Sequence, residues 1–114
     1  MFKEDAVNTV SSIDEINILK NKNEMLLVYF GSDSCGVCIS IKSKLERLLS
    51  KYPNIKLVKV ETENSPELCA AHSVFTIPVI ILYIQGKETI REARIISMEK
   101  LEQNISRYYD LFYN

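Results

Sequence analysis

The stretch FGSDSCGVC, residues 30–38, carries a C-x-x-C pair directly behind an apolar run. That run, EMLLVYF at residues 24–30, is continuous and rich in aliphatic and aromatic side chains, which favours a strand buried on both faces. Small polar residues then form a turn. From residue 35 to 51, apolar side chains recur every three or four positions, as in an amphipathic helix. The pattern therefore predicts Cys35 at a helix N-terminus and Cys38 one turn further on.

This placement has consequences for thiol chemistry. Unpaired backbone N–H groups and the positive end of the helix dipole stabilise a thiolate, so the pKa of Cys35 should lie below the free value of about 8.5. Cys38 can reach Cys35 and should point inward. Such a pair supplies an exposed nucleophile and a shielded thiol that resolves a mixed disulfide. Two alternatives stay open: accidental spacing, and a zinc site completed by Cys69 and His72.

The elements on either side complete an α/β pattern. We expect a short strand within 6–10, helices at 12–21 and 66–72, strands at 55–60, 79–84 and 88–95, and a last helix that starts at Ser97 and has Leu101, Ile105, Tyr108 and Phe112 on one face. Ser12 is a predicted capping residue, and so is Ser65, which precedes Pro66. Strands that alternate with helices predict a central mixed sheet, a parallel part plus a C-terminal antiparallel hairpin, with helices on both faces.

Composition excludes several classes of protein. The 114 residues fit a single domain, 1–114, and 46% apolar with 25% charged residues is ordinary for a folded chain. Fourteen basic against fifteen acidic residues leave a net charge of −1, without the basic excess of a nucleic-acid binder. No apolar run is long enough for a membrane span, and residues 1–10 do not resemble a secretory signal. We therefore expect a cytoplasmic monomer without nucleic-acid or membrane partners.

Several motifs together resemble the thioredoxin family. They are the C-x-x-C stretch, the segment TIPV at 76–79, the hairpin turn at Gln85-Gly86 and the strand lysine Lys59. The resemblance extends over residues 25–112 and implies a thioredoxin-like fold. By position it implies that Cys35 attacks, that Cys38 resolves, and that Ile77–Pro78 is a cis peptide that leaves the Ile77 backbone free to pair with substrate. The substrate rim that it implies consists of Gly31, Ser34, Gly36, Val37, Ile77, Pro78, Ala93 and Arg94.

Four residues depart from the family pattern. Ser34 replaces the usual Trp before the first cysteine, and Arg94 replaces a small residue on the rim. Val37 replaces the Pro between the cysteines, and its backbone N–H can stabilise the Cys35 thiolate and make the pair a stronger oxidant. Tyr29 replaces a buried Asp, and with Lys59 it is expected to tune proton transfer at Cys38.

The resemblance implies a protein-disulfide oxidoreductase that exchanges disulfides reversibly through Cys35 and Cys38. Its partners would be disulfide-containing protein substrates and, as electron donor, a reductase or a small thiol. No cofactor and no metal is expected. Because the Trp, Pro and Asp of the family are all replaced, a second interpretation is a thioredoxin-fold binding or adaptor module with little turnover.

Overall fold

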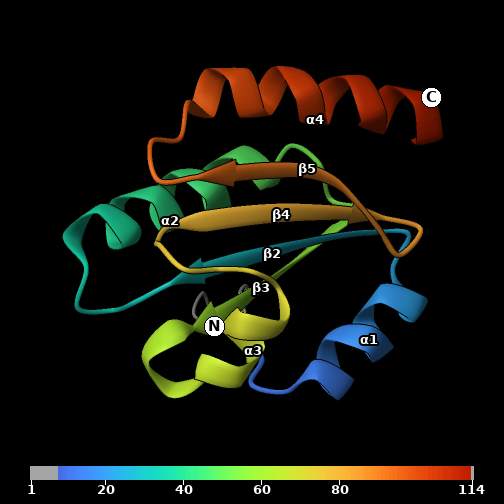
Figure 1. Ribbon diagram of the computed structural model, residues 1–114. Helices are drawn as coiled ribbons and strands as arrows, with labels where there is room; N and C mark the ends of the chain where they lie inside the picture. Colours follow the sequence, from blue (N-terminus) through green and yellow to red (C-terminus); the bar gives the residue numbers. More distant parts are fainter. Residues whose placement is uncertain (1–7, 114) are drawn as a thin grey trace.

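The computed structural model describes residues 8–113 and forms one five-stranded sheet between two layers of helices (Figure 1). The strands are β1 (Asn8–Thr9), β2 (Met25–Gly31), β3 (Ile55–Glu61), β4 (Val79–Ile84) and β5 (Lys87–Ala93). The helices are α1 (Ile13–Lys22), α2 (Gly36–Leu49), α3 (Pro66–Ala71) and α4 (Met98–Tyr113), with a short 3₁₀ turn, η2 (Thr62–Asn64), before α3. The predicted fold class is confirmed.

Strand β2 occupies the middle of the sheet, whose order is β1-β3-β2-β4-β5. It pairs in parallel with β3 and antiparallel with β4, so that Phe30 lies beside both Val60 and Val79. All seven residues of β2 are buried, which explains why its sequence is continuously apolar rather than alternating. As a result, the chain that leaves β2 for α2 starts between the end of β3 and the beginning of β4.

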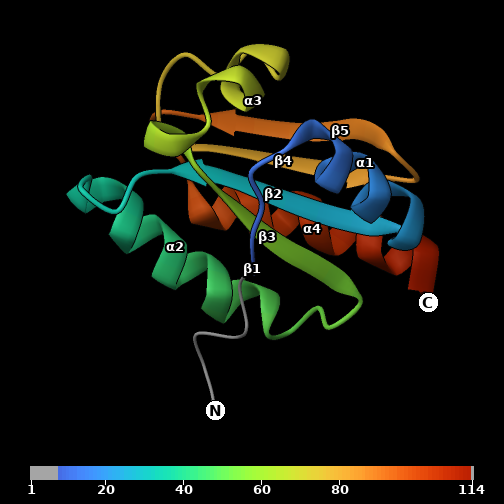
Figure 2. The same ribbon diagram turned by 90° about the horizontal axis from the view of Figure 1, so that it is seen from below.

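Alternate side chains of the strands build two cores. On one face, Leu27 and Tyr29 pack with residues of α2 and α4; on the other, Val28 and Phe30 pack with residues of α1 and α3. Figure 2 shows α1 and α3 on one side of the sheet and α2 and α4 on the other. The predicted helices on both faces are therefore present.

Most predicted boundaries agree with the structure within two residues. The capping box at Ser12 is confirmed, because the Ser12 hydroxyl accepts from the backbone N–H of Glu15 and the Glu15 carboxylate accepts from the Ser12 backbone. Ser97 likewise accepts from the N–H of Lys100. Ser65 precedes α3 as predicted but its side chain makes no capping bond. Of the predicted strand at 6–10, the structure shows β1; residues 6 and 7 lie outside the described residues.

The last strand and the last helix differ from expectation at their ends. Strand β5 stops at Ala93 rather than residue 95, because Arg94 turns into the left-handed region with φ 66°. In α4, Leu101 and Ile105 are fully buried and Tyr108 is half-buried, but Phe112 is exposed. Tyr109 packs instead between Tyr52 and Tyr113, with ring centroids 5.1 and 4.7 Å away. None of the helices among residues 8–113 combines the length and the apolarity that crossing a bilayer requires.

Candidate active site

The two thiols of the C-x-x-C pair lie in opposite environments at the start of α2. Cys35 is the N-cap residue and is half-buried, whereas Cys38 has only 2% of its surface exposed. The Cys35 sulfur accepts the backbone N–H of Cys38 at 3.4 Å, so it occupies the place of a capping oxygen. The predicted helix start therefore presents one sulfur to an anion-stabilising set of N–H groups and shields the other.

The same geometry separates the acidities of the two thiols. Hydrogen bonds from the Cys38 thiol and backbone, assisted by the backbone N–H of Val37, hold the pKa of Cys35 below its ordinary value. Burial, and then the hydrogen bond to Cys35, raise the pKa of Cys38. Because the thiolate is the reactive form, Cys35 is the nucleophile that this geometry favours at neutral pH.

We expect iodoacetamide to alkylate Cys35 well before Cys38 and Cys69 in the reduced protein. The alkylation rate should follow the thiolate fraction of Cys35, with a midpoint below the pH of about 8.5 that is usual for a free thiol. Stopped-time alkylation at several pH values, with peptide mass mapping, measures both quantities. Earlier labelling of Cys38 or Cys69 would reverse the assignment of the nucleophile.

The segment before β4 lies at the same end of the sheet. The Ile77–Pro78 peptide is cis, as the resemblance implied, and the Pro78 carbonyl accepts the backbone N–H of Arg94 at 2.9 Å. Ile77 is half-buried and packs against the same core as Cys35. The loop that follows β5 is thereby held next to the proline segment.

The predicted rim is partly exposed and partly buried. Exposed members are Ser34, Gly36, Val37, Ala93 and Arg94, whereas Ile77 is half-buried and Pro78 is buried. Two apolar side chains near the rim that were not predicted from the sequence, Phe75 and Ile95, are 81% and 93% exposed. Periodicity alone does not distinguish an exposed apolar side chain from one in the core.

Gly31, the remaining residue of the predicted rim, is buried like Pro78. Gly31 and Tyr29 share one face of β2, and the Tyr29 ring lies over the glycine. A Cβ atom at position 31 would stand 2.6 Å from the Tyr29 hydroxyl oxygen and 2.7 Å from its Cζ atom. The tyrosine therefore requires a residue without a side chain two positions later.

We expect Gly31→Ala to destabilise the protein by about 1–3 kcal/mol, the range found for overpacked cores. The added methyl group would have to displace a fully buried aromatic ring. Chemical denaturation measures the change, and Gly36→Ala is the matched control because a Cβ there meets no atom within 4 Å. Equal stabilities of the two variants would contradict the steric explanation.

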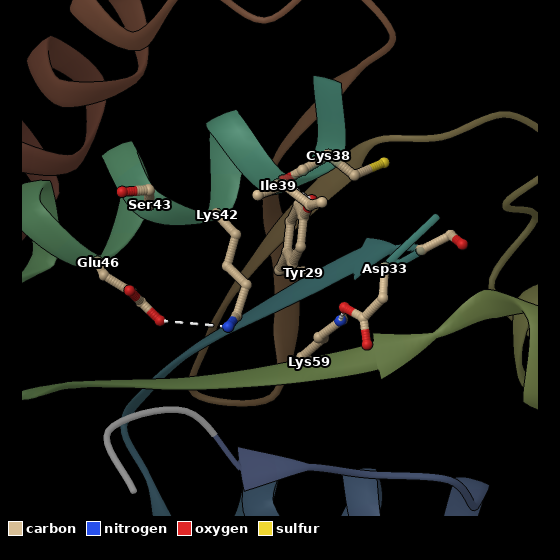
Figure 3. Close-up of a pocket in the computed structure, with 9 residues that line it drawn as sticks. Tyr29, Asp33, Cys38, Ile39, Lys42, Ser43, Glu46 and Lys59 are labelled. Atoms are coloured by element: carbon tan, nitrogen blue, oxygen red, sulfur yellow. Dashed lines mark hydrogen bonds and ion pairs between the residues drawn. The ribbon is translucent and has the colours of Figure 1, made fainter. Parts of the chain in front are cut away.

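A cavity of about 190 Å³ lies beside Cys38, between α2 and the ends of β2 and β3 (Figure 3). Its lining includes Tyr29, Cys38, Lys59 and Asp33. Tyr29 rises from β2 towards α2, and its hydroxyl donates to the backbone carbonyl of Cys38. Burial, and then the nearby Cys38, raise the pKa of the Tyr29 phenol far above its ordinary value, so Tyr29 stays neutral. The structure thus brings both predicted tuning residues to one cavity next to the resolving thiol.

Lys59 anchors the loop that precedes Cys35. Its ammonium group forms ion pairs with Asp33 and with Glu61, the latter at 3.1 Å. Burial lowers the pKa of Lys59, but its hydrogen bonds to the Asp33 and Glu61 carboxylates outweigh burial and raise the pKa overall. In the same loop, the hydroxyl of Ser34, the residue after Asp33, donates a hydrogen bond to the Glu63 carboxylate at 2.7 Å. Asp33, Glu61 and Glu63 were not identified from the sequence. Asp33 is a close sequence neighbour of Cys35, whereas the proximity of Glu61 and Glu63 to the Cys35 loop depends on the pairing of β2 with β3.

The third cysteine and the histidine have ordinary structural environments. Cys69 is buried in α3, as expected of a small apolar residue, and burial raises the pKa of its thiol. His72 ends α3 with its Nδ1 atom 2.9 Å from the Leu68 carbonyl oxygen. Across residues 8–113, the structure contains no group of three or more His, Cys, Asp and Glu side chains that could hold a metal ion. The alternative zinc site is therefore not supported.

Comparison with known proteins agrees with this site. The family model described as Thioredoxin matches residues 7–107. The chain is 36% identical over 96 residues to the thioredoxin-like protein YdfQ of Bacillus subtilis, an alignment that covers 84% of this chain and 85% of that one. It is 31% identical over 84 residues to a thioredoxin of Chlamydia trachomatis, an alignment that covers 74% of this chain and 82% of that one. A mutant thioredoxin from Halobacterium salinarum superposes with a TM-score of 0.82 at 20% identity, over 96% of both chains. Fasciola hepatica thioredoxin superposes with a TM-score of 0.80 at 27% identity, over 88% of this chain and 97% of that one.

The chain therefore belongs to the thioredoxin family. Its function is that of a thiol–disulfide oxidoreductase, an enzyme that acts on disulfide substrates. The adaptor interpretation with little turnover loses its main support, because the replaced Trp, Pro and Asp leave the reactive thiol pair intact.

Proposed function

We propose that this protein exchanges disulfides of protein substrates, with Cys35 as the attacking thiol and Cys38 as the resolving thiol. The observation that carries the proposal is the contrast at the start of α2. A half-exposed sulfur with a lowered pKa is bonded to the backbone N–H of a fully shielded second cysteine. From that arrangement it follows that Cys35 reacts with the substrate disulfide and that Cys38 then releases the substrate from the mixed disulfide.

Each cycle transfers two electrons. The Cys35 thiolate attacks one substrate sulfur, forms a mixed disulfide and expels the other substrate sulfur as a thiolate. Cys38 then loses its proton, attacks the Cys35 sulfur and releases the second substrate thiolate. The products are a substrate dithiol and a Cys35–Cys38 disulfide. The half-buried Ile77 lies directly before the cis Pro78, and its backbone would pair with an extended substrate segment during these steps.

A two-electron donor must reduce the Cys35–Cys38 disulfide after each turnover. We infer that a reductase or a small thiol serves this role, and that the protein acts as a monomer in the cytoplasm. The odd number of cysteines, which suits a disulfide framework poorly, and the balanced charge of the chain support this compartment.

Reduction of insulin by dithiothreitol tests the proposal. The protein should accelerate the reaction above the uncatalysed rate, and acid quenching with mass analysis should detect a mixed disulfide at Cys35. An unaccelerated reaction would instead favour the adaptor interpretation.

Val37→Pro is expected to make the pair a stronger reductant. Proline removes the backbone N–H that helps to lower the pKa of Cys35, and the first turn of a helix tolerates it. The potential should become more negative by about 30 mV for each unit by which the Cys35 pKa rises. Equilibration with glutathione buffers measures the potential, with Ile39→Ala as control for an exposed apolar change on the same helix. An unchanged or less negative potential would show that the Val37 N–H does not contribute.

A further inference from the structure

Arg94 occupies a backbone conformation that disfavours every residue with a side chain. Its φ of 66° lies in the left-handed region, where the Cβ atom of an ordinary residue is crowded and glycine is not. The conformation is held by the hydrogen bond from the Arg94 N–H to the Pro78 carbonyl. A glycine would satisfy the same geometry, so the fold itself gains nothing from an arginine here.

The guanidinium group also lacks a structural role. Among residues 8–113, the exposed Arg94 side chain has no hydrogen bond and no ion pair. Arg91, three positions earlier, is bonded to Glu88 and to the His72 carbonyl. A residue held in an unfavourable conformation, without a partner and beside a reactive site, is typical of a functional constraint.

The sheet order places this free cation on one flank of the reactive thiol. Strand β2 leads to Cys35; β3 lies on one side of β2, and β4 with β5 lies on the other. At this end of the sheet the β3 side carries Glu61 and Glu63, and the β5 side carries Arg94. The β3 flank of Cys35 therefore carries carboxylates, two of which (Asp33 and Glu61) pair with Lys59, and the β5 flank carries the guanidinium of Arg94.

We propose that Arg94 is a specificity-determining residue that binds a carboxylate of the substrate, close in sequence to the attacked cysteine. The inference rests on the proposed function. Its geometric basis is that a segment paired with the Ile77 backbone lies one hydrogen bond away from Arg94, since Pro78 follows Ile77 and bonds to Arg94. Arginine offers two parallel N–H groups to a carboxylate, and a neighbouring charge acts mainly on the encounter of the two proteins.

Two disulfide peptides provide the test. They differ only in one residue next to the reactive cysteine, which is Glu in one peptide and Lys in the other. The pair is made twice, with the charged residue before the cysteine and with the charged residue after it. Their reduction by the reduced protein gives second-order rate constants. The wild type should prefer the Glu peptide by about fivefold, as expected of one exposed bidentate ion pair, and 1 M salt should reduce that preference. Arg94→Gly should abolish the preference for the Glu peptide, and Arg94→Glu should invert it. The melting temperature of Arg94→Gly should equal or exceed that of the wild type. Lys44→Ala, which removes the same charge from an exposed site on α2, should retain the preference.

The outcomes separate the two proposals. A wild type that reduces neither peptide contradicts the proposed function. Equal rates for the two peptides in the wild type, or a full preference in Arg94→Gly, contradict only the role of Arg94. A lower melting temperature of Arg94→Gly would show that the arginine stabilises the fold and is not retained for substrates.

Discussion

Cys35→Ser should reduce the catalysed rate of disulfide reduction to the uncatalysed rate. A serine hydroxyl at the start of α2 can accept the Cys38 N–H as the sulfur does, so the helix should still be capped. It cannot form a disulfide, however, and the first step of the cycle is lost. The insulin assay measures the rate, and circular dichroism checks that the fold is retained.

Two further variants make this result specific. Cys38→Ser should still attack substrates but should accumulate a stable mixed disulfide, because the resolving thiol is missing. Cys69→Ala removes the other buried thiol and should keep the wild-type rate, since Cys69 lies in α3 and packs into the core on the opposite face of the sheet from Cys38. Residual turnover in Cys35→Ser, or a loss in Cys69→Ala, would contradict the assignment.

Tyr29→Asp should have opposite effects on stability and on turnover. We expect a loss of about 3 kcal/mol or more in unfolding free energy, because the variant leaves a cavity in place of a buried ring and adds a carboxyl group to an apolar site. Turnover in disulfide reduction should rise by about tenfold. A carboxylate at position 29 can accept the proton of Cys38, and general-base assistance commonly exceeds that factor.

The structure explains why the wild-type tyrosine favours stability over speed. Its hydroxyl holds the first turn of α2 through the Cys38 carbonyl, and its raised pKa prevents it from acting as a base near neutral pH. Deprotonation of the buried Cys38 should then limit the resolving step, because position 29 offers no base to accept its proton.

Tyr29→Phe is the matched control for this prediction. It keeps the ring and removes the hydroxyl, so stability should fall by about 1 kcal/mol, as for one hydrogen bond, with no gain in turnover. Denaturant titration and single-turnover kinetics of mixed-disulfide resolution measure the two effects. A folded Tyr29→Asp protein with unchanged or slower resolution would show that position 29 does not control this step.

Local patterns were sufficient for most of the fold. The continuous apolar run of β2, the helical spacing after Cys35 and the capping box at Ser12 each depend on neighbouring residues, and the structure agrees with all three. Sequence neighbours likewise determine the chemistry of the thiol pair, because a cysteine at the N-cap position of a helix meets N–H groups from its own next residues.

Long-range pairing determined the rest, and no local pattern contains it. The register of β2 with β3 brings Glu61 to the loop that precedes Cys35, and the hairpin of β4 and β5 brings Arg94 to the cis proline. The burial of Gly31 has a related reason, because the Tyr29 ring packs over it. The sequence alone was enough to predict the thioredoxin-like fold and the reactive pair, because short-range hydrogen bonds and periodic burial produce them. The surroundings of that pair required the folded chain, since contacts between distant residues depend on strand register and side-chain packing.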